Sequence, residues 1–275
     1  MPELPEVETV ARSLAPLVGR RIVAVATSGK RLRHPVDRRR LGQATVGRRL
    51  VAVERIAKYL LFRFDGPDAL LAHLGMTGHF LVAAEAEPAP PHTHAVFTLD
   101  GAGEELRYVD PRRFGVLRVY QQEELPGCSE LVGLGPDPLG DQFTVGALDE
   151  ALRRTRGQAI KPFLLDQRRV AGLGNIYASE ALFVAAIAPR RRADRLRPAE
   201  VGRLHGAIRE VLTASVARRG TTLRNYLAAD GNPGENRAFL AVYERAGEPC
   251  LRCGATLEHV VQSGRSTYFC RRCQR

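Results

Sequence analysis

The sequence predicts an α+β chain of several domains, with a β-rich N-terminal half, a helical middle section and a small cysteine-rich module at the C-terminal end. Three observations support this fold class. Short apolar segments separated by Gly, Pro and Asp turns continue as far as Tyr120, which is typical of antiparallel strands. Beyond Leu134–Gly140 the apolar residues recur at helical spacing. Four of the five cysteines lie within the last 26 residues.

At 275 residues the chain exceeds a typical single domain and is long enough to bury a sizeable core. The segment Leu134–Gly140, LGPDPLG, has the composition of an interdomain linker. We therefore predict three domains, which are a β domain over residues 1–133, a helical domain over 134–236 and a cysteine-rich domain over 237–275.

The first expected element is a helix, because the apolar positions from Val7 to Val18 follow helical spacing, Pro5 suits the first turn and Gly19 marks the stop. Strand-like segments follow at Arg21–Thr27, Arg49–Ile56, Tyr59–Phe64, Ala69–His73, Ala95–Leu99, Glu105–Val109 and Val116–Tyr120. This succession predicts a β-sandwich or a β-barrel.

The middle section is expected to be helical. Its predicted helices are Val145–Arg156, Lys161–Gln167, Ile176–Val184 and Pro198–Arg218, with a glycine-interrupted turn at Ala171–Asn175. The last helix has the clearest pattern, since its apolar residues form one stripe and the remaining face is charged.

The chain is strongly basic, with 41 Lys and Arg against 30 Asp and Glu and a net charge of +11. This excess of positive charge favours a polyanionic partner such as nucleic acid. The alternative is a basic surface that binds no such partner. The basic clusters at Lys30–Arg40 and Arg190–Arg197 fit either nonspecific attraction or a solvated face. The chain has no run of eighteen apolar residues and no secretory signal pattern, so we expect a soluble cytoplasmic protein without membrane association.

The C-terminal cysteines have the spacing C-x2-C-x16-C-x2-C, which is typical of a four-cysteine zinc site. The predicted ligands are Cys250, Cys253, Cys270 and Cys273. Four thiolates leave no open coordination position, so the ion should be structural. The arginines of this module favour a DNA-facing finger, although solvated arginines fit as well. Cys128, alone in mid-chain, has no predicted role.

The opening decapeptide MPELPEVETV places three glutamates and two prolines at the start of a basic chain. Removal of Met1 before a small residue would leave Pro2 as a free secondary amine, which is a candidate nucleophile for Schiff-base chemistry. Glu3 is adjacent and Glu6 lies about one helical turn further on, so both are placed to move protons. Taken alone, the three glutamates are better explained as residues that favour the positive end of a helix.

Longer motifs decide between the catalytic and the helix-stabilising interpretation of the opening decapeptide. PELPEVETV, HLGMTG at His73–Gly78, DPRRFG at Asp110–Gly115, LLDQ and GLGNIYASEALF within Leu164–Phe183, and the closing CRRCQR occur in one order over the whole chain. Together they resemble bacterial formamidopyrimidine-DNA glycosylase. The resemblance implies an N-terminal catalytic β-sandwich with an N-terminal helix, a helix-two-turn-helix DNA-binding domain and a C-terminal four-cysteine zinc-finger β-hairpin.

The resemblance also implies a bifunctional base-excision repair enzyme for damaged double-stranded DNA. It would remove oxidised purines such as 8-oxoguanine and formamidopyrimidines, and cleave the strand by β,δ-elimination. Pro2 would attack C1′, Glu3 would donate and shuttle protons, and Glu6 would support them. Lys58 matches the lysine associated with β-elimination and Arg265 the arginine associated with δ-elimination, although each alone fits an ordinary phosphate contact. We expect one structural zinc ion, no organic cofactor and a monomer.

Further DNA contacts follow from the same resemblance. Met76, Arg112 and Phe114 would fill the gap left by the extruded base, with Arg112 facing the orphaned base. Their glycine- and arginine-rich neighbours fit exposed loops better than a core. The residues expected at phosphates are His92, Arg112, Arg156 and Asn175, the last within the Gly172–Asn175 turn.

Two alternatives remain at this point. One is an endonuclease VIII-like enzyme for oxidised pyrimidines, against which PELPEV and the split set of gap-filling residues argue. The other is a noncatalytic zinc-finger protein that binds damaged DNA, which would leave Pro2 and Glu3 unexplained. The loop from Asp230 to Tyr243 carries Glu235-Asn236 where many family members have an aromatic pair, so the sequence does not rank the oxidised purines.

Overall fold

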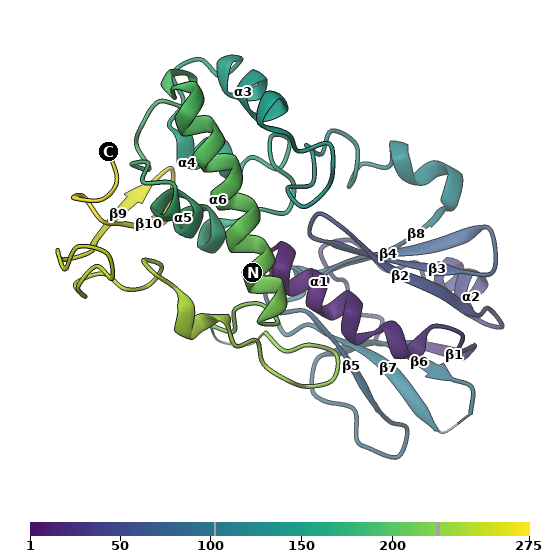
Figure 1. Ribbon diagram of the computed structural model, residues 1–275. Coiled ribbons are helices and arrows are strands. Elements are labelled where there is room, and N and C mark those ends of the chain that lie inside the picture. The colour runs from purple at the N-terminus through teal and green to yellow at the C-terminus, as the bar shows by residue number, and fades with distance from the viewer. Residues whose placement is uncertain (102, 224–225) are drawn as a thin grey trace. The chain divides into compact units, whose positions relative to one another are not determined.

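The computed structural model describes residues 1–101, 103–223 and 226–275. The chain forms two compact units (Figure 1). The first comprises Met1–Val132 and Arg218–Glu235, and the second comprises Gly133–Ala217 and Asn236–Arg275. Both units combine segments that are distant in the sequence, and they do not test the division into three consecutive domains, which stays a prediction.

The first unit is built on two four-stranded antiparallel sheets. One has the order β1 (Ile22–Thr27), β6 (Thr93–Leu99), β7 (Glu104–Val109) and β5 (His79–Ala84). The other has the order β2 (Leu50–Ile56), β3 (Tyr59–Phe64), β4 (Asp68–His73) and β8 (Val116–Gln121). The helical elements of this unit are α1 (Leu4–Ser13), η1 (Ala15–Leu17), α2 (Arg38–Thr45) and η2 (Gln122–Gly127).

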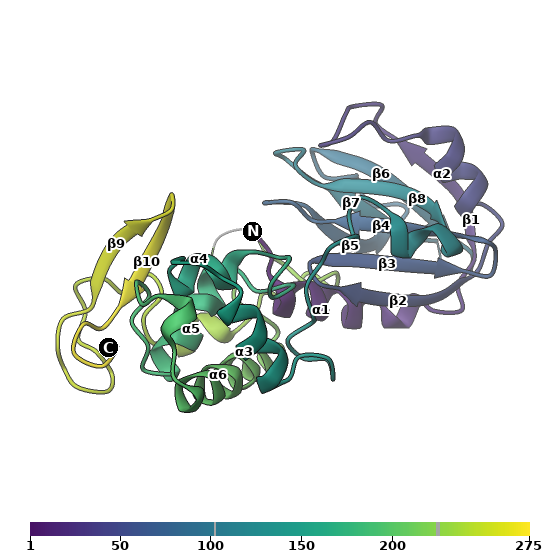
Figure 2. The ribbon, with the colours of Figure 1, turned by 90° about the horizontal axis from the view of Figure 1, so that it is seen from above.

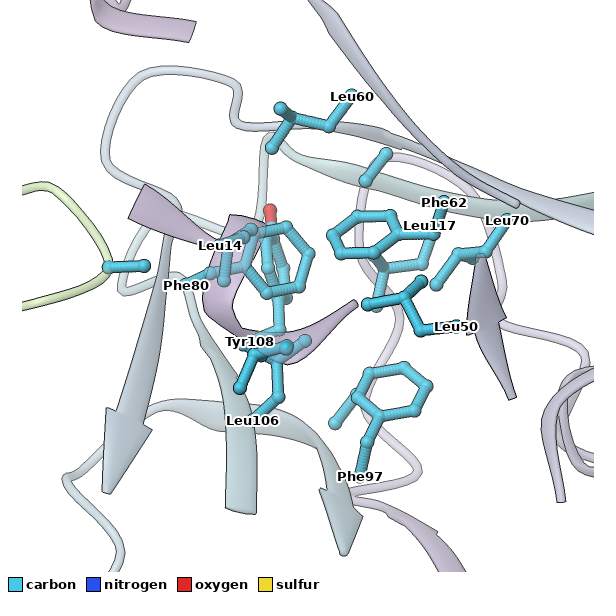
Figure 3. Packing of buried hydrophobic residues seen from close by; sticks show 14 of the residues in the cluster. Leu14, Leu50, Leu60, Phe62, Leu70, Phe80, Phe97, Leu106, Tyr108 and Leu117 are labelled. Carbon is cyan, nitrogen blue, oxygen red and sulfur yellow. The ribbon is translucent and has the colours of Figure 1, made fainter. Parts of the chain in front are cut away.

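The two sheets and α1 share one apolar core, which makes this part of the chain the expected β-sandwich with an N-terminal helix. Figure 3 shows Phe62 from one sheet facing Phe80 and Tyr108 from the other, and Phe62 and Phe80 have ring centroids 5.0 Å apart. Leu14, which follows α1, joins the same cluster and is fully buried. Val7 and Val10 of α1 belong to this cluster too, so the helix is packed on the sandwich core.

The strand prediction is confirmed to within two residues at each of the seven segments, but it omits β5 and the helix α2. The β5 segment HFLVAA lacks regular alternation, because only Phe80 and Ala83 are buried. The α2 segment opens on three arginines and buries only Leu41, Ala44 and Thr45. Its helix start is stabilised by Asp37, whose side chain accepts a hydrogen bond from the N–H of Arg40 at 2.9 Å.

The second unit contains the predicted helices and a β-hairpin (Figure 2). Its elements are α3 (Val145–Arg153), α4 (Ile160–Leu165), α5 (Asn175–Val184), η3 (Ala193–Arg195), α6 (Pro198–Ala217), η4 (Asn236–Phe239), β9 (Glu258–Gln262) and β10 (Arg265–Phe269). Helix α5 packs on α6, where the Tyr177 hydroxyl and the Ser215 hydroxyl lie 2.6 Å apart in the interior. None of the helices in the described ranges is both long and apolar enough to cross a membrane.

Candidate active site and nucleic-acid interface

The first turn of α1 joins two buried carboxylates. Glu3 stands at the N-cap and Glu6 three residues later, and each side chain accepts a hydrogen bond from the backbone N–H of the other residue. The bond from the Glu3 N–H to Glu6 Oε2 is 2.8 Å. Glu3 is 3% exposed and Glu6 is 2% exposed. Charged carboxylates are this deeply buried only where hydrogen bonds and the positive helix end stabilise them.

The second oxygen of Glu6 is bound by a segment more than 200 residues further along the chain. Glu6 Oε1 accepts a hydrogen bond from the N–H of Thr221 at 2.7 Å, and the Tyr226 hydroxyl donates to the Glu6 carbonyl at 3.1 Å. Gly220 has φ of 79°, and a Cβ there would lie 2.8 Å from Glu6 Oε1. Glycine is therefore required for this approach. Sequence analysis missed these residues, because Gly-Thr is too common a pair to indicate a contact.

The N-terminal amine lies in surroundings that favour its neutral form. Burial lowers the pKa of the Met1 amine below the ordinary value of 8.0, Glu3 and Glu6 raise it, and Lys58 and Arg112 lower it. The net direction is downward. Lys58 lies in the two-residue turn between β2 and β3 and is 6% exposed. A neutral amine is the nucleophilic form, so the chemistry predicted for Pro2 has suitable surroundings.

The predicted gap-filling residues lie on two neighbouring loops, called here the wedge loops, at residues 74–78 and 110–115. Met76 is 40% exposed and Phe114 is 45% exposed, as their sequence context predicted. The Arg112 guanidinium lies 4.7 Å from the Phe114 ring centroid. Gly75 has φ of 61°, and a Cβ there would come within 2.6 Å of the Phe114 carbonyl carbon. The two loops therefore touch through their backbones.

Asp110 is the residue that ties the wedge loops together, and sequence analysis gave it no role. Its Oδ1 accepts a hydrogen bond from the Thr77 hydroxyl and its Oδ2 accepts one from the N–H of Gly115, both at 2.8 Å. Its own N–H donates to the carbonyl of His92 at 3.0 Å. One fully buried carboxylate thus positions both loops, and its backbone adds the exposed His92.

Replacing this carboxylate gives the first test. In Asp110→Asn the amide NH2 would face either the N–H of Gly115, which now donates to Oδ2, or the N–H of Arg112, which lies 3.3 Å from Oδ1, and a buried group left unsatisfied costs about 1–3 kcal/mol. We expect a lower melting temperature and a weaker affinity for a duplex that carries a lesion, measured by thermal unfolding and fluorescence anisotropy. The exposed Asp141→Asn serves as control. Wild-type stability together with wild-type affinity would show that Asp110 does not position the loops.

In the second unit the start of α5 is tied to strand β10. The Asn175 side-chain amide donates to the Ser266 carbonyl at 2.9 Å, and Lys161 Nζ donates to the same carbonyl at 2.7 Å. The neighbouring Arg265 is exposed, as is Arg156 beyond α3. The N–H of Gly172 is occupied by the Gln167 side chain at 2.9 Å. In this structure the Asn175 amide binds the hairpin. A phosphate contact by Asn175 therefore stays a prediction.

The four predicted cysteine ligands converge in the second unit. Their sulfur atoms all lie within 4.8 Å of one another, with Cys250 and Cys273 at 3.9 Å and Cys253 and Cys270 at 3.5 Å. A tetrahedral zinc with Zn–S bonds of about 2.3 Å places its sulfurs about 3.8 Å apart. The site therefore fits zinc held by four thiolates. Cys128 belongs to a separate apolar cluster, where it packs with Leu61 and Leu71.

Removal of the metal gives a second test. Without zinc the β9–β10 hairpin has only a small apolar cluster around Phe183 and Leu257, so it should lose its fold while the sandwich keeps its own core. We expect a strong chelator to reduce affinity for damaged duplex to the nonspecific level, Kd of about 10⁻⁴–10⁻⁶ M, as measured by anisotropy. Circular dichroism should retain the β signal. Unchanged affinity after complete zinc removal would exclude the hairpin from DNA binding.

Comparison with known families accounts for most of the chain. Residues 1–117 match the formamidopyrimidine-DNA glycosylase N-terminal domain, and residues 134–226 match the H2TH domain of the same enzymes. The chain belongs to the formamidopyrimidine-DNA glycosylase family. Residues 247–275 match the zinc finger found in FPG and IleRS, and they include all four cysteines. The chain thus carries one structural zinc ion.

Individual relatives agree with this assignment. The chain is 49% identical to formamidopyrimidine-DNA glycosylase of Symbiobacterium thermophilum, covering 100% of this chain and 89% of the relative. Identity to the Herpetosiphon aurantiacus enzyme is 46% over the full length of both. Among solved structures, MutM of Thermus thermophilus has a TM-score of 0.87 at 42% identity, covering 99% and 98% of the two chains. A Lactococcus lactis Fpg complex with DNA containing N7-benzyl-Fapy-dG has a TM-score of 0.91 at 33% identity, covering 99% of each chain.

Glu235, in the segment expected to depart from the family pattern, pairs with Thr221 in the first unit. The Glu235 N–H donates to the Arg218 carbonyl at 2.9 Å, and Glu235 forms an isolated antiparallel bridge with Thr221. Glu235 therefore contributes backbone pairing next to the residue that holds Glu6. Asn236 opens η4 in the second unit and is buried.

Proposed function

We propose that this DNA glycosylase excises oxidised purines from duplex DNA and cleaves the resulting abasic strand through a Schiff base at Pro2. The observation that carries the proposal is the first turn of α1. There, two interlocked buried carboxylates follow Pro2 closely in the chain, in surroundings where burial lowers the pKa of the Met1 amine. A nucleophile with acids in reach is the arrangement that covalent catalysis on a sugar carbon needs.

In the proposed first step, the Pro2 nitrogen lone pair attacks C1′ of the damaged nucleotide. The bond from C1′ to the base breaks, and the base leaves with the bonding pair and takes up a proton from solvent. Glu3 accepts the proton that the Pro2 nitrogen loses and gives it to the ring oxygen of the sugar as the ring opens, so that nitrogen and C1′ form an iminium. Glu6, held by Thr221, keeps the first turn of α1 in place during this proton transfer.

Strand cleavage follows from the same iminium, because its positive charge acidifies the C2′ hydrogens. Loss of a C2′ proton expels the 3′ phosphate, and a second elimination expels the 5′ phosphate. Lys58, whose charge acts on the N-terminal amine, is assigned to the first elimination. Arg265, exposed on the hairpin, is assigned to the second.

Base extrusion explains the remaining assignments. The glycosidic carbon is inaccessible within the stack, so the damaged nucleotide must be flipped out of the duplex. Met76, Arg112 and Phe114 are exposed on the wedge loops and fit the emptied space. His92, Arg156 and Asn175 are proposed at phosphates. We further propose that the enzyme acts as a monomer in the cytoplasm.

Borohydride trapping tests the proposal. Purified protein is reduced on duplexes that carry 8-oxoguanine opposite cytosine, an oxidised pyrimidine or no damage, and the cross-linked residue is mapped by mass spectrometry. We expect a cross-link at Pro2 that favours 8-oxoguanine. The pyrimidine arm is needed because a related Lactococcus lactis structure holds DNA containing an oxidised pyrimidine. Preference for that lesion would change the substrate class, and binding without trapping would overturn the covalent mechanism.

A further inference from the structure

We propose that Glu180 is a positioning residue for the second elimination, because it fixes the segment that leads into the zinc finger at residues 247–275 and, through that segment, the hairpin that carries Arg265. Glu180, this segment and the finger all belong to the second unit. The inference rests on the proposed function, which assigns Arg265 to the second elimination. Glu180 itself is given no contact with the substrate.

Glu180, on α5, binds three consecutive backbone N–H groups through one buried carboxylate. Its Oε2 accepts a hydrogen bond from the N–H of Ala241 at 2.8 Å. Its Oε1 accepts two more, from the N–H of Val242 at 2.9 Å and from the N–H of Tyr243 at 2.8 Å. The residue is 5% exposed. A carboxylate is retained at such depth only where hydrogen bonds compensate for its lost hydration, and here a neighbouring backbone supplies the donors.

The segment that Glu180 binds has no regular secondary structure of its own. Residues 240–248 lie between η4 and β9 and form neither helix nor strand. Arg245 donates to the carbonyl of Ala241 at 2.8 Å and to the Glu248 carboxylate at 2.7 Å, so its side chain holds the same segment from the carbonyl side. Glu180 therefore supplies the acceptors that a helix or a sheet would otherwise provide.

The bound segment packs on both the metal site and the hairpin. Val242 is fully buried and joins the apolar cluster that includes the predicted zinc ligands Cys250 and Cys270. The ring of Tyr243 meets the ring of Tyr268 on β10 edge to face, with centroids 5.1 Å apart. A displacement of this segment would therefore displace a surface on which β10 packs.

The position of Arg265 depends on how this hairpin is held, because the residue stands exposed at the start of β10. The next carbonyl along the strand, that of Ser266, accepts hydrogen bonds from Lys161 at 2.7 Å and from Asn175 at 2.9 Å. Helix α5 packs against β10 and also carries Glu180 (Figure 2). The strand thus has a direct attachment next to Arg265 and an indirect one through the segment that Glu180 binds.

The two eliminations should respond differently to a shift of the hairpin. A group that assists an elimination acts only within hydrogen-bond reach of the atoms concerned. A misplacement of about 1 Å can cost about 100-fold in rate. The first elimination is assigned to Lys58, which belongs to the first unit and not to the finger. Loss of the Glu180 contacts should therefore slow the second elimination more than the first.

The test measures the ratio of δ-elimination product to β-elimination product on a duplex with one abasic site. In Glu180→Gln the amide NH2 must face at least one of the three backbone N–H groups, so at least one bond is lost. We expect one zinc ion per chain to stay bound, and the ratio to fall by about 10- to 100-fold. A general loss of folded protein would lower both products and leave the ratio unchanged. Glu210→Gln, exposed on α6, is the matched control and should keep the wild-type ratio.

Two further variants test the route from Glu180 to Arg265. Arg265→Gln should already have a low ratio, and adding Glu180→Gln to it should have no further effect. Tyr243→Leu removes the ring contact with Tyr268 and should lower the ratio as well. Because Tyr243→Leu leaves the buried carboxylate and its backbone bonds in place, it tests the same route even where Glu180→Gln loses zinc.

A wild-type product ratio in both Glu180→Gln and Tyr243→Leu would overturn the assignment. An additional fall of the ratio on combining Glu180→Gln with Arg265→Gln would also overturn it. Borohydride trapping of wild-type protein on the same duplex separates this inference from the proposed function, since the Schiff base precedes both eliminations. Absence of trapping would contradict the proposed function, whereas normal trapping with an unchanged ratio in the variants would contradict only the role of Glu180.

Discussion

Pro2→Leu is expected to abolish cleavage and borohydride trapping while leaving affinity for damaged duplex within the wild-type range. A large second residue prevents removal of Met1, so the terminal amine would move by one residue, about 3.8 Å along the chain. A misplacement of about 1 Å alone can cost about 100-fold in rate. The expected loss is therefore at least about 100-fold in single-turnover cleavage. Mass spectrometry verifies that Met1 is retained.

Pro2→Ala is the matched control, because alanine permits removal of Met1 and leaves a primary amine in the same place. It should retain part of the trapping. With wild-type protein, trapping should rise with pH, since the amine attacks only when neutral. Full cleavage by Pro2→Leu would remove Pro2 from the mechanism.

The parts of this protein that sequence analysis predicted correctly depend on local patterns. The C-x2-C pairs specify a metal site through spacing alone, and the seven predicted strands have apolar segments bounded by turn residues. Exposure of Met76 and Phe114 was predictable from their glycine- and arginine-rich neighbours. Helix α1 starts at Leu4, earlier than its apolar repeat at Val7 indicates, because the reciprocal bonds of Glu3 and Glu6 close its first turn.

What sequence analysis missed depends on contacts between distant segments. Nothing near Glu6 indicates that Thr221 donates to it, because the pairing depends on how residues 218–235 return to the sandwich. Asp110 was part of a quoted motif, yet its role follows only from its bond to Thr77 on the other wedge loop. The sequence places Arg31 and Arg33 within a basic cluster but does not say which way they face. The structure shows both side chains exposed, on either side of the buried Leu32.

The same contacts explain why the site is rigid enough for chemistry. Groups that transfer protons must be held within hydrogen-bond reach of the reacting atoms. Both oxygens of Glu6 are occupied, one by the Glu3 N–H and one by the Thr221 N–H. Glu6 is therefore fixed as a structural acceptor, and proton transfer is assigned to Glu3, which is adjacent to Pro2 in the chain. We therefore expect substitutions of Glu3 and of Glu6 to have different effects.

Glu3→Gln should reduce excision of 8-oxoguanine by about 10²–10⁴-fold, the range expected for loss of a general acid or base. Glutamine keeps the size and acceptor oxygen of the N-cap, so α1 should stay folded. The sugar of an abasic site is a hemiacetal in equilibrium with its open-chain aldehyde, so it can open without a proton from the enzyme. Its trapping by Glu3→Gln should therefore fall much less than excision, and single-turnover assays on both substrates measure the difference.

Glu8→Gln is the matched control on the same helix, because Glu8 is ion-paired with Arg12 and Arg55 at 2.8 Å in each case and has no assigned role with the substrate. It should leave both activities near wild type. An equal loss of excision and abasic trapping in Glu3→Gln would mean that the residue only supports the structure around Pro2. Unequal loss, with excision more affected, assigns proton transfer in sugar opening to Glu3, because the two substrates differ at that step while Pro2 acts on both.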